Sequence, residues 1–311
     1  MPGIGVVSNP NSGINRRRPQ LVQQLAYVLG DRGEIAQPEG VDRLVSVAEN
    51  FRRHGIDILC INGGDGTTHE VLTAFLQVYG TEPLPMVALL RAGTINTVAR
   101  SISLPRKAPE ALLGRLVARY HAREELPVVE RNLAIVDDRH AGFLFGNGLI
   151  ASFMEAYYAG GTVGTGKALR VLSRTVASAL VGGPFIQRML RPIRARVCVD
   201  GRLLEHAEFL SIGAATIPDM GLGFRPFHEI DRHPDRIQVL GFACPVRGLV
   251  ASLPRWYCKL PAARPDISSV VASELVIEAD EPMSFQLDGD LLQGGPRTVV
   301  RAGPRVRLVC G

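Results

Sequence analysis

The sequence has little lysine, no cysteine pattern and no long apolar run. Lysine occurs only at Lys107, Lys167 and Lys259, so the net charge of +5 rests almost entirely on arginine. A mild positive excess suits nucleotides, anionic lipid surfaces or nucleic acid, and by itself does not choose among them. No window interleaves aromatic and basic residues as nucleic-acid readers do, so no nucleic-acid partner is expected.

The remaining absences concern membranes and the redox compartment. No stretch of 18 or more apolar residues is present, so no membrane span is expected. The first residues, Met1 to Val7, lack a basic region followed by an apolar one, and do not predict a signal peptide. The five cysteines are scattered without metal-type spacing, which favours buried thiols in a reducing cytoplasm.

The chain has enough length and apolar content for two domains. It has 311 residues, of which 46% are hydrophobic and 21% charged. This composition supports sizeable cores and argues against wholesale disorder. Two stretches of different texture, before and after about Arg123, suggest where the two domains meet.

The stretch that organises the chain is a glycine loop between an apolar run and a helical pattern. The apolar run, Ile56 to Ile61, is typical of a buried parallel strand. The loop that follows consists of Gly63, Gly64, Asp65, Gly66 and Thr67. Glycines and a helix N-terminus together can cradle phosphate, and the sensible role of Asp65 there is to hold Mg²⁺. The alternative is a tight turn with Asp65 as a helix cap.

A second loop of this kind follows the first predicted strand, Gly3 to Ser8. Its residues are Asn9, Pro10, Asn11, Ser12 and Gly13. In the functional interpretation, Asn9 and Ser12 donate to a nucleotide and an arginine of Arg16 to Arg18 neutralises its charge. Taken alone, an ordinary turn with a solvated arginine cluster is the better interpretation.

A third glycine loop follows the apolar run Pro85 to Leu90. Gly93, Thr94 and Asn96 could bind a ribose, base or phosphate, and the alternative is helix capping. Ligands of parallel α/β sheets bind at the carboxyl ends of strands. Because all three loops follow apolar strands, all three can face one cleft, which favours phosphate binding over the turn interpretation.

Strands and helices alternate over the first 122 residues, which predicts a parallel α/β sheet with helices on both faces. The helices are expected at about 19–30, 41–53 and 108–120. After this the strands are short and separated by turn residues, which is typical of an antiparallel sandwich or barrel. These later strands are expected at 128–136, 142–149, 193–199, 209–217, 237–243, 270–277, 283–287, 299–300 and 306–309, with helices at 169–181 and 245–259.

The last motif is Asp288-Gly289-Asp290, which follows the strand predicted at 283–287. Its local sequence favours a hairpin turn. The functional alternative is a pair of carboxylates, one of which accepts a proton from a substrate hydroxyl.

Taken in order, these pieces resemble the diacylglycerol kinase catalytic-domain family, which includes bacterial soluble lipid kinases, sphingosine kinases and ceramide kinases. The matching segments are 9–13, 63–67 with Glu70, 93–96, and 288–290. The glycine-aspartate motif alone is shared with NAD kinases and phosphofructokinases, whereas the ordered set of four is specific.

The resemblance implies an N-terminal α/β domain with a parallel sheet, as in NAD kinases and phosphofructokinases, and a C-terminal antiparallel β-sandwich domain with added helices. On this basis we expect a nucleotide-binding domain at 1–124, a lipid-substrate domain at 125–295, and a final segment from about 296 to 311 that packs back on the first domain. It further implies that Gly63 to Thr67 bind ATP phosphates and Mg²⁺, and that Asp288 is the general base with Asp290 in support.

The sequence departs from the family pattern at its acidic positions. Thr97 stands where an Asp often follows the third motif. Many relatives have an Asp at the start of the second domain, where the sequence here reads Pro127-Val128-Val129-Glu130 and offers only Glu130. Glu70 is a candidate second ligand for the magnesium of Asp65. Some bacterial members bind a structural magnesium in the second domain, and the corresponding stretch here keeps Asp231 and Asp235.

We therefore expect a cytoplasmic, membrane-peripheral kinase that phosphorylates a hydroxyl of diacylglycerol or a related lipid with ATP and Mg²⁺. The alternatives are a kinase for a soluble acceptor such as NAD, and an inactive nucleotide- or lipid-binding homologue. Its expected partners are a neutral or anionic lipid substrate and, transiently, a membrane surface, while a homodimer is left open. The candidate membrane contacts are Lys167, Arg170, Arg174, Arg188, Arg191 and Arg194, and separately Arg247, Arg255, Trp256 and Lys259.

Overall fold

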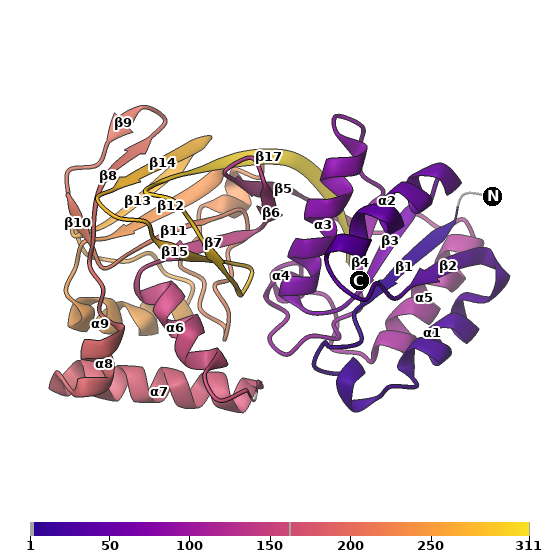
Figure 1. Cartoon of the computed structure of the whole chain (residues 1–311), viewed down its shortest axis with the longest axis horizontal. Helices are drawn as coiled ribbons and strands as arrows, with labels where there is room; N and C mark the ends of the chain where they lie inside the picture. Colours follow the sequence, from indigo (N-terminus) through magenta and orange to yellow (C-terminus); the bar gives the residue numbers. More distant parts are fainter. Residues whose placement is uncertain (1–2, 162, 311) are drawn as a thin grey trace. The chain divides into compact units, whose positions relative to one another are not determined.

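The chain forms two compact units, Met1–Arg131 with Arg305–Gly311, and Asn132–Pro304. The computed structural model describes residues 3–161 and 163–310 (Figure 1). The chain passes between the units inside two unbroken strands, β5 (Val128–Val136) and β17 (Arg297–Val309). The boundaries expected from the sequence, at 124 and 296, lie before these crossings because no turn signal interrupts either strand where it changes unit.

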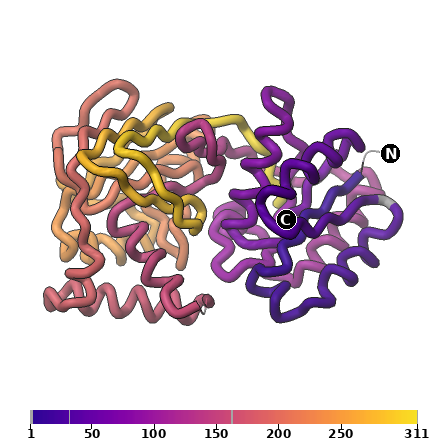
Figure 2. Tube along the Cα trace, viewed as in Figure 1, coloured from indigo at the N-terminus to yellow at the C-terminus, as the bar shows by residue number. Residues whose placement is uncertain are grey.

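The first unit is built on a parallel sheet. Its strands lie in the order β2 (Gly33–Ala36), β1 (Ile4–Ser8), β3 (Ile58–Asn62) and β4 (Met86–Leu89). The end of β17 adds a further parallel strand beside β4, so the C-terminal part of the chain returns to this unit (Figure 2). The pairing aligns Ser8 with Asn62 and Ile61 with Leu89, so β1, β3 and β4 end at one edge.

Helices cover this sheet as the apolar pattern predicts. They are α1 (Leu21–Leu29), α2 (Asp42–His54), α3 (Asp65–Tyr79), α4 (Thr97–Ser101) and α5 (Pro109–His121). Helix α1 packs on α5 and α2 on α3 (Figure 1). Phe51 of α2 and Phe75 of α3 are fully buried with their rings 6.2 Å apart, which anchors the second pair to the core.

The second unit contains two antiparallel sheets. One includes β5 (Val128–Val136), β6 (His140–Gly142), β8 (Ile193–Val199), β9 (Arg202–Leu203), β10 (Glu208–Phe209), β14 (Glu274–Ala279) and the first part of β17. The other has the order β13 (Ile267–Ala272), β12 (Ile237–Phe242), β11 (Ser211–Ala215), β7 (Leu144–Asn147), β15 (Ser284–Leu287) and β16 (Asp290–Gln293).

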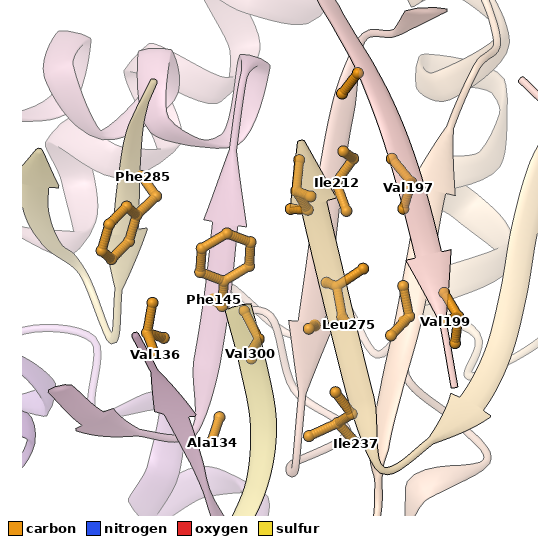
Figure 3. Packing of buried hydrophobic residues seen from close by; sticks show 14 of the residues in the cluster. Ala134, Val136, Phe145, Val197, Val199, Ile212, Ile237, Leu275, Phe285 and Val300 are labelled. Atoms are coloured by element: carbon orange, nitrogen blue, oxygen red, sulfur yellow. The ribbon is translucent and has the colours of Figure 1, made fainter. Parts of the chain in front are cut away.

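A buried apolar cluster joins the two sheets. Val197 and Leu275 come from the first sheet, while Phe145, Ile212 and Phe285 come from the second (Figure 3). In the first sheet β8 is buried at its odd-numbered positions, whereas β7, β11 and β12 of the second sheet are buried throughout, because helices cover the other face of that sheet. The alternation in β8 is the pattern expected of a sandwich, in which each sheet turns one face inward.

Four helices cover the other face of the second sheet. They are α6 (Leu149–Tyr158), α7 (Thr165–Val181), α8 (Pro184–Met189) and α9 (Val246–Tyr257). A second apolar cluster holds them, in which Ile186 of α8 and Trp256 of α9 pack with Leu240 and Phe242 of the sheet. Within residues 3–161 and 163–310, none of the helices has the length and apolarity needed to cross a membrane.

The expected fold class, a parallel α/β domain followed by an antiparallel sandwich with added helices, is confirmed. Several elements differ from the sequence prediction. The strand predicted at 142–149 divides into β6 and β7, and Leu149 begins α6, because a short apolar run does not distinguish a buried helix from a strand. Helix α8 and strand β2 were not predicted, and the two strands predicted at 299–300 and 306–309 are one strand, β17.

Candidate functional site

In the first unit, the three glycine loops contact one another at the carboxyl edge of the sheet. The side-chain amide of Asn9 donates to the Thr67 hydroxyl at 2.8 Å, which joins the first loop to the second. The backbone N–H of Ile14 donates to the Ala92 carbonyl at 2.9 Å, which joins the first loop to the third. The convergence expected from the strand order is therefore present.

Two of the glycines allow an approach that no other residue would permit. A Cβ built on Gly93 would lie 2.2 Å from the Cα of Gly64, and one on Gly64 would lie 3.0 Å from the Cα of Gly93. The second and third loops thus meet backbone to backbone. This leaves a surface of main-chain groups, which suits the close approach of a phosphate.

A network of buried amides supports the first two loops from beneath. The Asn15 amide donates to the carbonyls of Asn9 and Asn62, at 2.7 and 3.1 Å. The Asn62 amide in turn donates to the Ser8 hydroxyl at 2.9 Å. Asn15 and Asn62 were not predicted as site residues, although Asn62 is a polar residue at the end of the otherwise apolar strand β3.

Two polar atoms of this region are buried without a hydrogen-bond partner in the described chain, the Ser12 hydroxyl and the Asn62 side-chain oxygen. A buried hydroxyl without a partner is costly, so such atoms commonly mark a ligand or water position. Ser12 was predicted as a nucleotide contact, and its hydroxyl remains available for one.

Asp65 begins α3 but caps a different helix. Its two carboxylate oxygens accept the backbone N–H groups of Thr97 and Val98 at 2.8 and 3.1 Å, at the start of α4. The sequence analysis considered Asp65 as a cap of its own helix or as a magnesium ligand, and did not foresee this long-range cap. Burial raises the pKa of the Asp65 carboxyl, while these two amides and nearby Arg91 act in the opposite direction.

Arg91 is a buried cation that the sequence analysis did not single out. Its guanidinium donates to the Leu104 carbonyl at 2.5 Å, and its backbone has a positive φ of 53°. Burial, together with Arg106 and Arg100, lowers the pKa of Arg91. Arg91 thus lies near Asp65, and Arg100 and Arg106 add positive charge around Arg91.

Other predicted contacts are engaged within the loops. The Asn96 amide donates to the Gly93 carbonyl at 2.9 Å and its oxygen accepts the Gly93 N–H at 3.1 Å, so Asn96 closes its own turn. Asn9 likewise uses its oxygen for the Asn11 N–H. Thr94 lies against Gly13, where an added Cβ would be 2.9 Å from its hydroxyl, while Pro10 and Arg16 are exposed.

In the second unit, Asp288 and Gly289 form the two-residue turn of the β15–β16 hairpin. Leu287 pairs with Asp290 across the turn, and φ is 49° at Asp288 and 96° at Gly289. These values are those of a type I′ turn, for which Asp-Gly is a preferred sequence. The local prediction of a hairpin turn is therefore correct.

The Asp288 side chain does more than form the turn. It is 6% exposed, and its carboxylate accepts the backbone N–H groups of Phe143 and Leu144, both at 2.9 Å. Gly142 makes room for it, since a Cβ there would lie 2.6 Å from a carboxylate oxygen of Asp288. Asp290 is half-buried at the start of β16. The hairpin thus holds the Asp288 carboxylate against the start of β7.

The structure does not gather the predicted metal ligands into a cage. No group of three or more His, Cys, Asp or Glu side chains able to hold a metal occurs in residues 3–161 and 163–310. Glu70 is half-buried on α3, and burial raises its pKa. Asp231 bonds Arg225 at 3.2 Å and Asp235 lies 3.6 Å from Arg236, so each candidate ligand for a structural magnesium lies beside an arginine.

Comparison with known proteins agrees with this arrangement. Residues 3–124 match the diacylglycerol kinase catalytic domain. Lipid kinase YegS of Escherichia coli K12 is 38% identical over 64 residues, and a probable lipid kinase YegS from Shigella flexneri is equally similar. Each match spans 21% of this chain and 21% of the relative, so only about a fifth of those proteins is aligned.

Solved structures extend the likeness to the fold of the whole chain. A diacylglycerol kinase from Bacillus anthracis superimposes with a TM-score of 0.65 at 15% identity, covering 99% of this chain and 97% of that one. A second chain from the same organism gives a TM-score of 0.70 with the same coverage. The resemblance drawn from the motifs is therefore confirmed: residues 3–124 match the diacylglycerol kinase catalytic domain, and the whole chain has the fold of these solved structures.

Proposed function

We propose that the chain is a lipid kinase, which transfers a phosphoryl group from ATP, with Mg²⁺, to a hydroxyl of diacylglycerol or a related lipid. The observation that carries the proposal is the backbone-to-backbone meeting of the glycine loops in a domain of the diacylglycerol kinase type. Phosphoryl transfer demands positioning and charge neutralisation from the protein more than covalent chemistry.

The loops supply the nucleotide side of this reaction. Main-chain groups of Gly63 to Thr67 and the first turn of α3 would hold phosphate oxygens. The buried Ser12 hydroxyl would donate to the same ligand, which would satisfy its missing hydrogen bond. Exposed Arg16 and the buried cation Arg91 would offset the charge of the triphosphate.

The donor set fits a magnesium ion that is held jointly with phosphate, and does not fit a cage made by protein alone. Mg²⁺ commonly takes one or two carboxylates, waters and substrate oxygens. Asp65, with Glu70 further along α3, would provide the carboxylates, since an oxygen that accepts one N–H keeps a second lone pair. When bound, the ion would neutralise charge on the transferring group.

Asp288 would accept the proton of the lipid hydroxyl. The Phe143 and Leu144 amides fix its carboxylate, which keeps acceptor capacity on each oxygen. A base held by backbone amides cannot rotate away from its substrate, and such positioning is what general-base catalysis requires. Asp290 would support it from the other end of the turn.

A second candidate is a nucleotide- or lipid-binding protein without catalysis. The observation that favours it is the engagement of Asp65 in capping α4, together with Thr97 at a position where an acid is common in the family. In this case the glycine loops would bind nucleotide, and no phosphoryl group would be transferred.

Radiolabel transfer from ATP to lipids in mixed micelles tests the proposal. The panel contains diacylglycerol, monoacylglycerol, phosphatidylglycerol, sphingosine and ceramide, with NAD as the soluble acceptor. The expected result is label in one lipid that is lost in Asp288→Asn. Label only in NAD would support a kinase for soluble acceptors, and ATP binding without label in any acceptor would support the binding protein.

A further inference from the structure

The helical layer of the second unit contains no acidic residue in three of its four helices. No Asp or Glu occurs from Ala156 to Val199, a range that includes α7 and α8, or from Arg236 to Pro265, which includes α9. The basic residues of these helices are Lys167, Arg170, Arg174, Arg188, Arg247 and Arg255. These three helices therefore carry positive charge and no acidic residue of their own.

Helix α7 presents the clearest surface of this layer. It packs on α6, α8 and α9 through Ala168, Val171, Thr175 and Ala179, and it is the outermost helix of its unit in Figure 1. Its exposed positions are Thr165, Gly166, Leu169, Arg170, Ser173, Arg174, Ala177, Leu180 and Val181. This outward face of α7 is composed only of apolar, small, hydroxyl and cationic side chains.

The large apolar side chains on this face are well exposed. Leu169 is 52%, Leu180 55% and Val181 78% accessible to solvent. Leu169 and Leu180 are eleven residues apart and form one row along the helix. Arg170, Arg174 and Val181 follow at intervals of four and seven residues and form the neighbouring row on the same side, because these spacings correspond to whole helical turns. An amphipathic helix normally turns its apolar residues inward, whereas α7 has apolar residues on both faces.

Among the described residues, the arginines of α7 and α8 have no acidic partner. The structure records no ion pair for Arg170, Arg174 or Arg188 in the part of the chain that it describes, and Arg174 instead stacks on the Phe185 ring at 4.3 Å. In the sheets, by contrast, Arg301 bonds both Glu274 and Asp138. The positive charge of Arg301 is thus neutralised by two acids, whereas that of Arg170 and Arg174 is left available on α7.

We propose that the outward face of α7 docks on the surface of an anionic lipid bilayer. This proposal deepens the proposed function, because a kinase for a membrane lipid needs a surface that meets the membrane. Cations at the level of the head groups and aliphatic side chains below them are the features of an interfacial helix. At 1.5 Å per residue, a helix of this length spans about 25 Å of membrane surface.

The chemistry of the face distinguishes a bilayer from other anionic partners. A nucleic acid would engage the arginines but would leave Leu169, Leu180 and Val181 in water, because phosphate backbones offer no apolar surface. A second copy of this face would place like charges opposite one another. Only a bilayer surface satisfies both the cations and the aliphatic side chains.

Vesicle co-sedimentation of the full-length chain tests the proposal without any need for kinase activity. The vesicles contain phosphatidylcholine alone, or phosphatidylcholine with phosphatidylglycerol. We expect the unmodified chain to bind the anionic vesicles, and salt to weaken this binding. The double variant Arg170→Gln, Arg174→Gln should bind them about thirtyfold more weakly, since each arginine near an anionic surface contributes about 1 kcal/mol.

A matched double variant controls for net charge. Arg139→Gln with Arg202→Gln removes two exposed arginines of the same unit outside the helices, and should bind vesicles as the unmodified chain does. A further variant, Leu169→Ser with Leu180→Ser, should lose the part of binding that survives high salt. Equal binding by both arginine double variants, binding to RNA but to no vesicle, or no vesicle binding at all would overturn the proposal.

Activity distinguishes failure of this proposal from failure of the proposed function. Arg170→Gln, Arg174→Gln should phosphorylate a short-chain, monomeric diacylglycerol at the unmodified rate and lose activity only on vesicle substrate. If the unmodified chain has no activity on either substrate, the proposed kinase function is wrong. Its vesicle binding would still decide whether α7 docks on a bilayer.

Discussion

Asp65 and Asp288 are two acids that the sequence predicts to act together, and each is tied to backbone amides within its own unit. Asp65 lies at a helix start and caps a second helix, α4, whereas Asp288 lies in a hairpin turn and binds the start of β7. Asp65 is half-buried, while Asp288 is 6% exposed.

A carboxylate can thus be fixed in place by two kinds of secondary structure. The Asp65 carboxylate completes a short helix whose first amides would otherwise lack partners. The Asp288 carboxylate joins two neighbouring strand ends at a turn that requires positive φ. In both places a glycine provides space: Gly93 for Gly64, the residue before Asp65, and Gly142 for the Asp288 carboxylate.

The largest expected effect concerns activity at Asp288. Asp288→Asn should lower turnover by about 10²–10⁴-fold on the lipid acceptor, because an amide cannot accept the hydroxyl proton. It should also lower the free energy of unfolding by about 1–3 kcal/mol, since one amide of β7 then meets an NH₂ group. Turnover with radiolabelled ATP and thermal melting measure the two effects, and full activity in this variant would exclude Asp288 as the base.

The two glycines offer a matched pair for stability. Gly93→Ala would place a Cβ 2.2 Å from the Cα of Gly64, and Gly142→Ala would place one 2.6 Å from a carboxylate oxygen of Asp288. Each should lower the free energy of unfolding by about 1–3 kcal/mol through overpacking.

Gly114→Ala is the control for this pair, because a Cβ there meets only Val28 at 3.8 Å within helix α5. It should raise stability by about 0.5–1 kcal/mol. Denaturant unfolding measures all three variants, and Gly93→Ala of unchanged stability would contradict the close contact between the second and third loops.

A third acidic region, the loop with Asp231 where a structural magnesium was expected, can be tested by removing metal. Arg225 lies between buried Asp219, at 3.7 Å, and Asp231, at 3.2 Å, so a guanidinium supplies the positive charge. EDTA should therefore leave the melting temperature of the chain unchanged. Arg225→Met should lower the free energy of unfolding by about 1–3 kcal/mol because it removes a partner of a buried carboxylate. A clear fall in melting temperature with EDTA would favour a metal site.

The smallest expected effect is a pH dependence that belongs to Asp65. Burial raises the pKa of its carboxyl, more than the Thr97 and Val98 amides lower it. The folded state therefore binds this proton more tightly than the unfolded state, and the contribution of Asp65 to stability should grow as the pH falls toward the ordinary Asp pKa. Unfolding experiments on the unmodified chain and on Asp65→Asn across this pH range measure the effect. The difference between their free energies of unfolding should shift in favour of the unmodified chain as the pH falls. A difference that is independent of pH would contradict the raised pKa.

The N-terminal sheet and its loops were largely predictable from sequence. Apolar runs such as 56–61 followed by glycines require a strand and a turn, and the parallel order then brings the loops to one edge. Periodicity was less informative in the second unit, where Leu149 begins a helix inside an apolar run that also suits a strand.

The amide contacts of the candidate site were not predictable. Asp65 bonds residues 32 and 33 positions away, and Asp288 bonds residues 145 and 144 positions away. Local sequence indicates that a carboxylate is available at each turn. Which distant N–H groups reach it depends on the packing of whole strands and helices.

The sequence by itself determined the fold class, the three glycine loops and the hairpin turn at Asp288, because these follow from local backbone preference and from apolar periodicity. Only the tertiary structure decided that Asp65 caps α4, that Arg225 lies between two acids, and that the acid-free face of α7 is exposed. Each of these depends on which surfaces meet after folding, and burial and long-range contacts have no local signature in the chain.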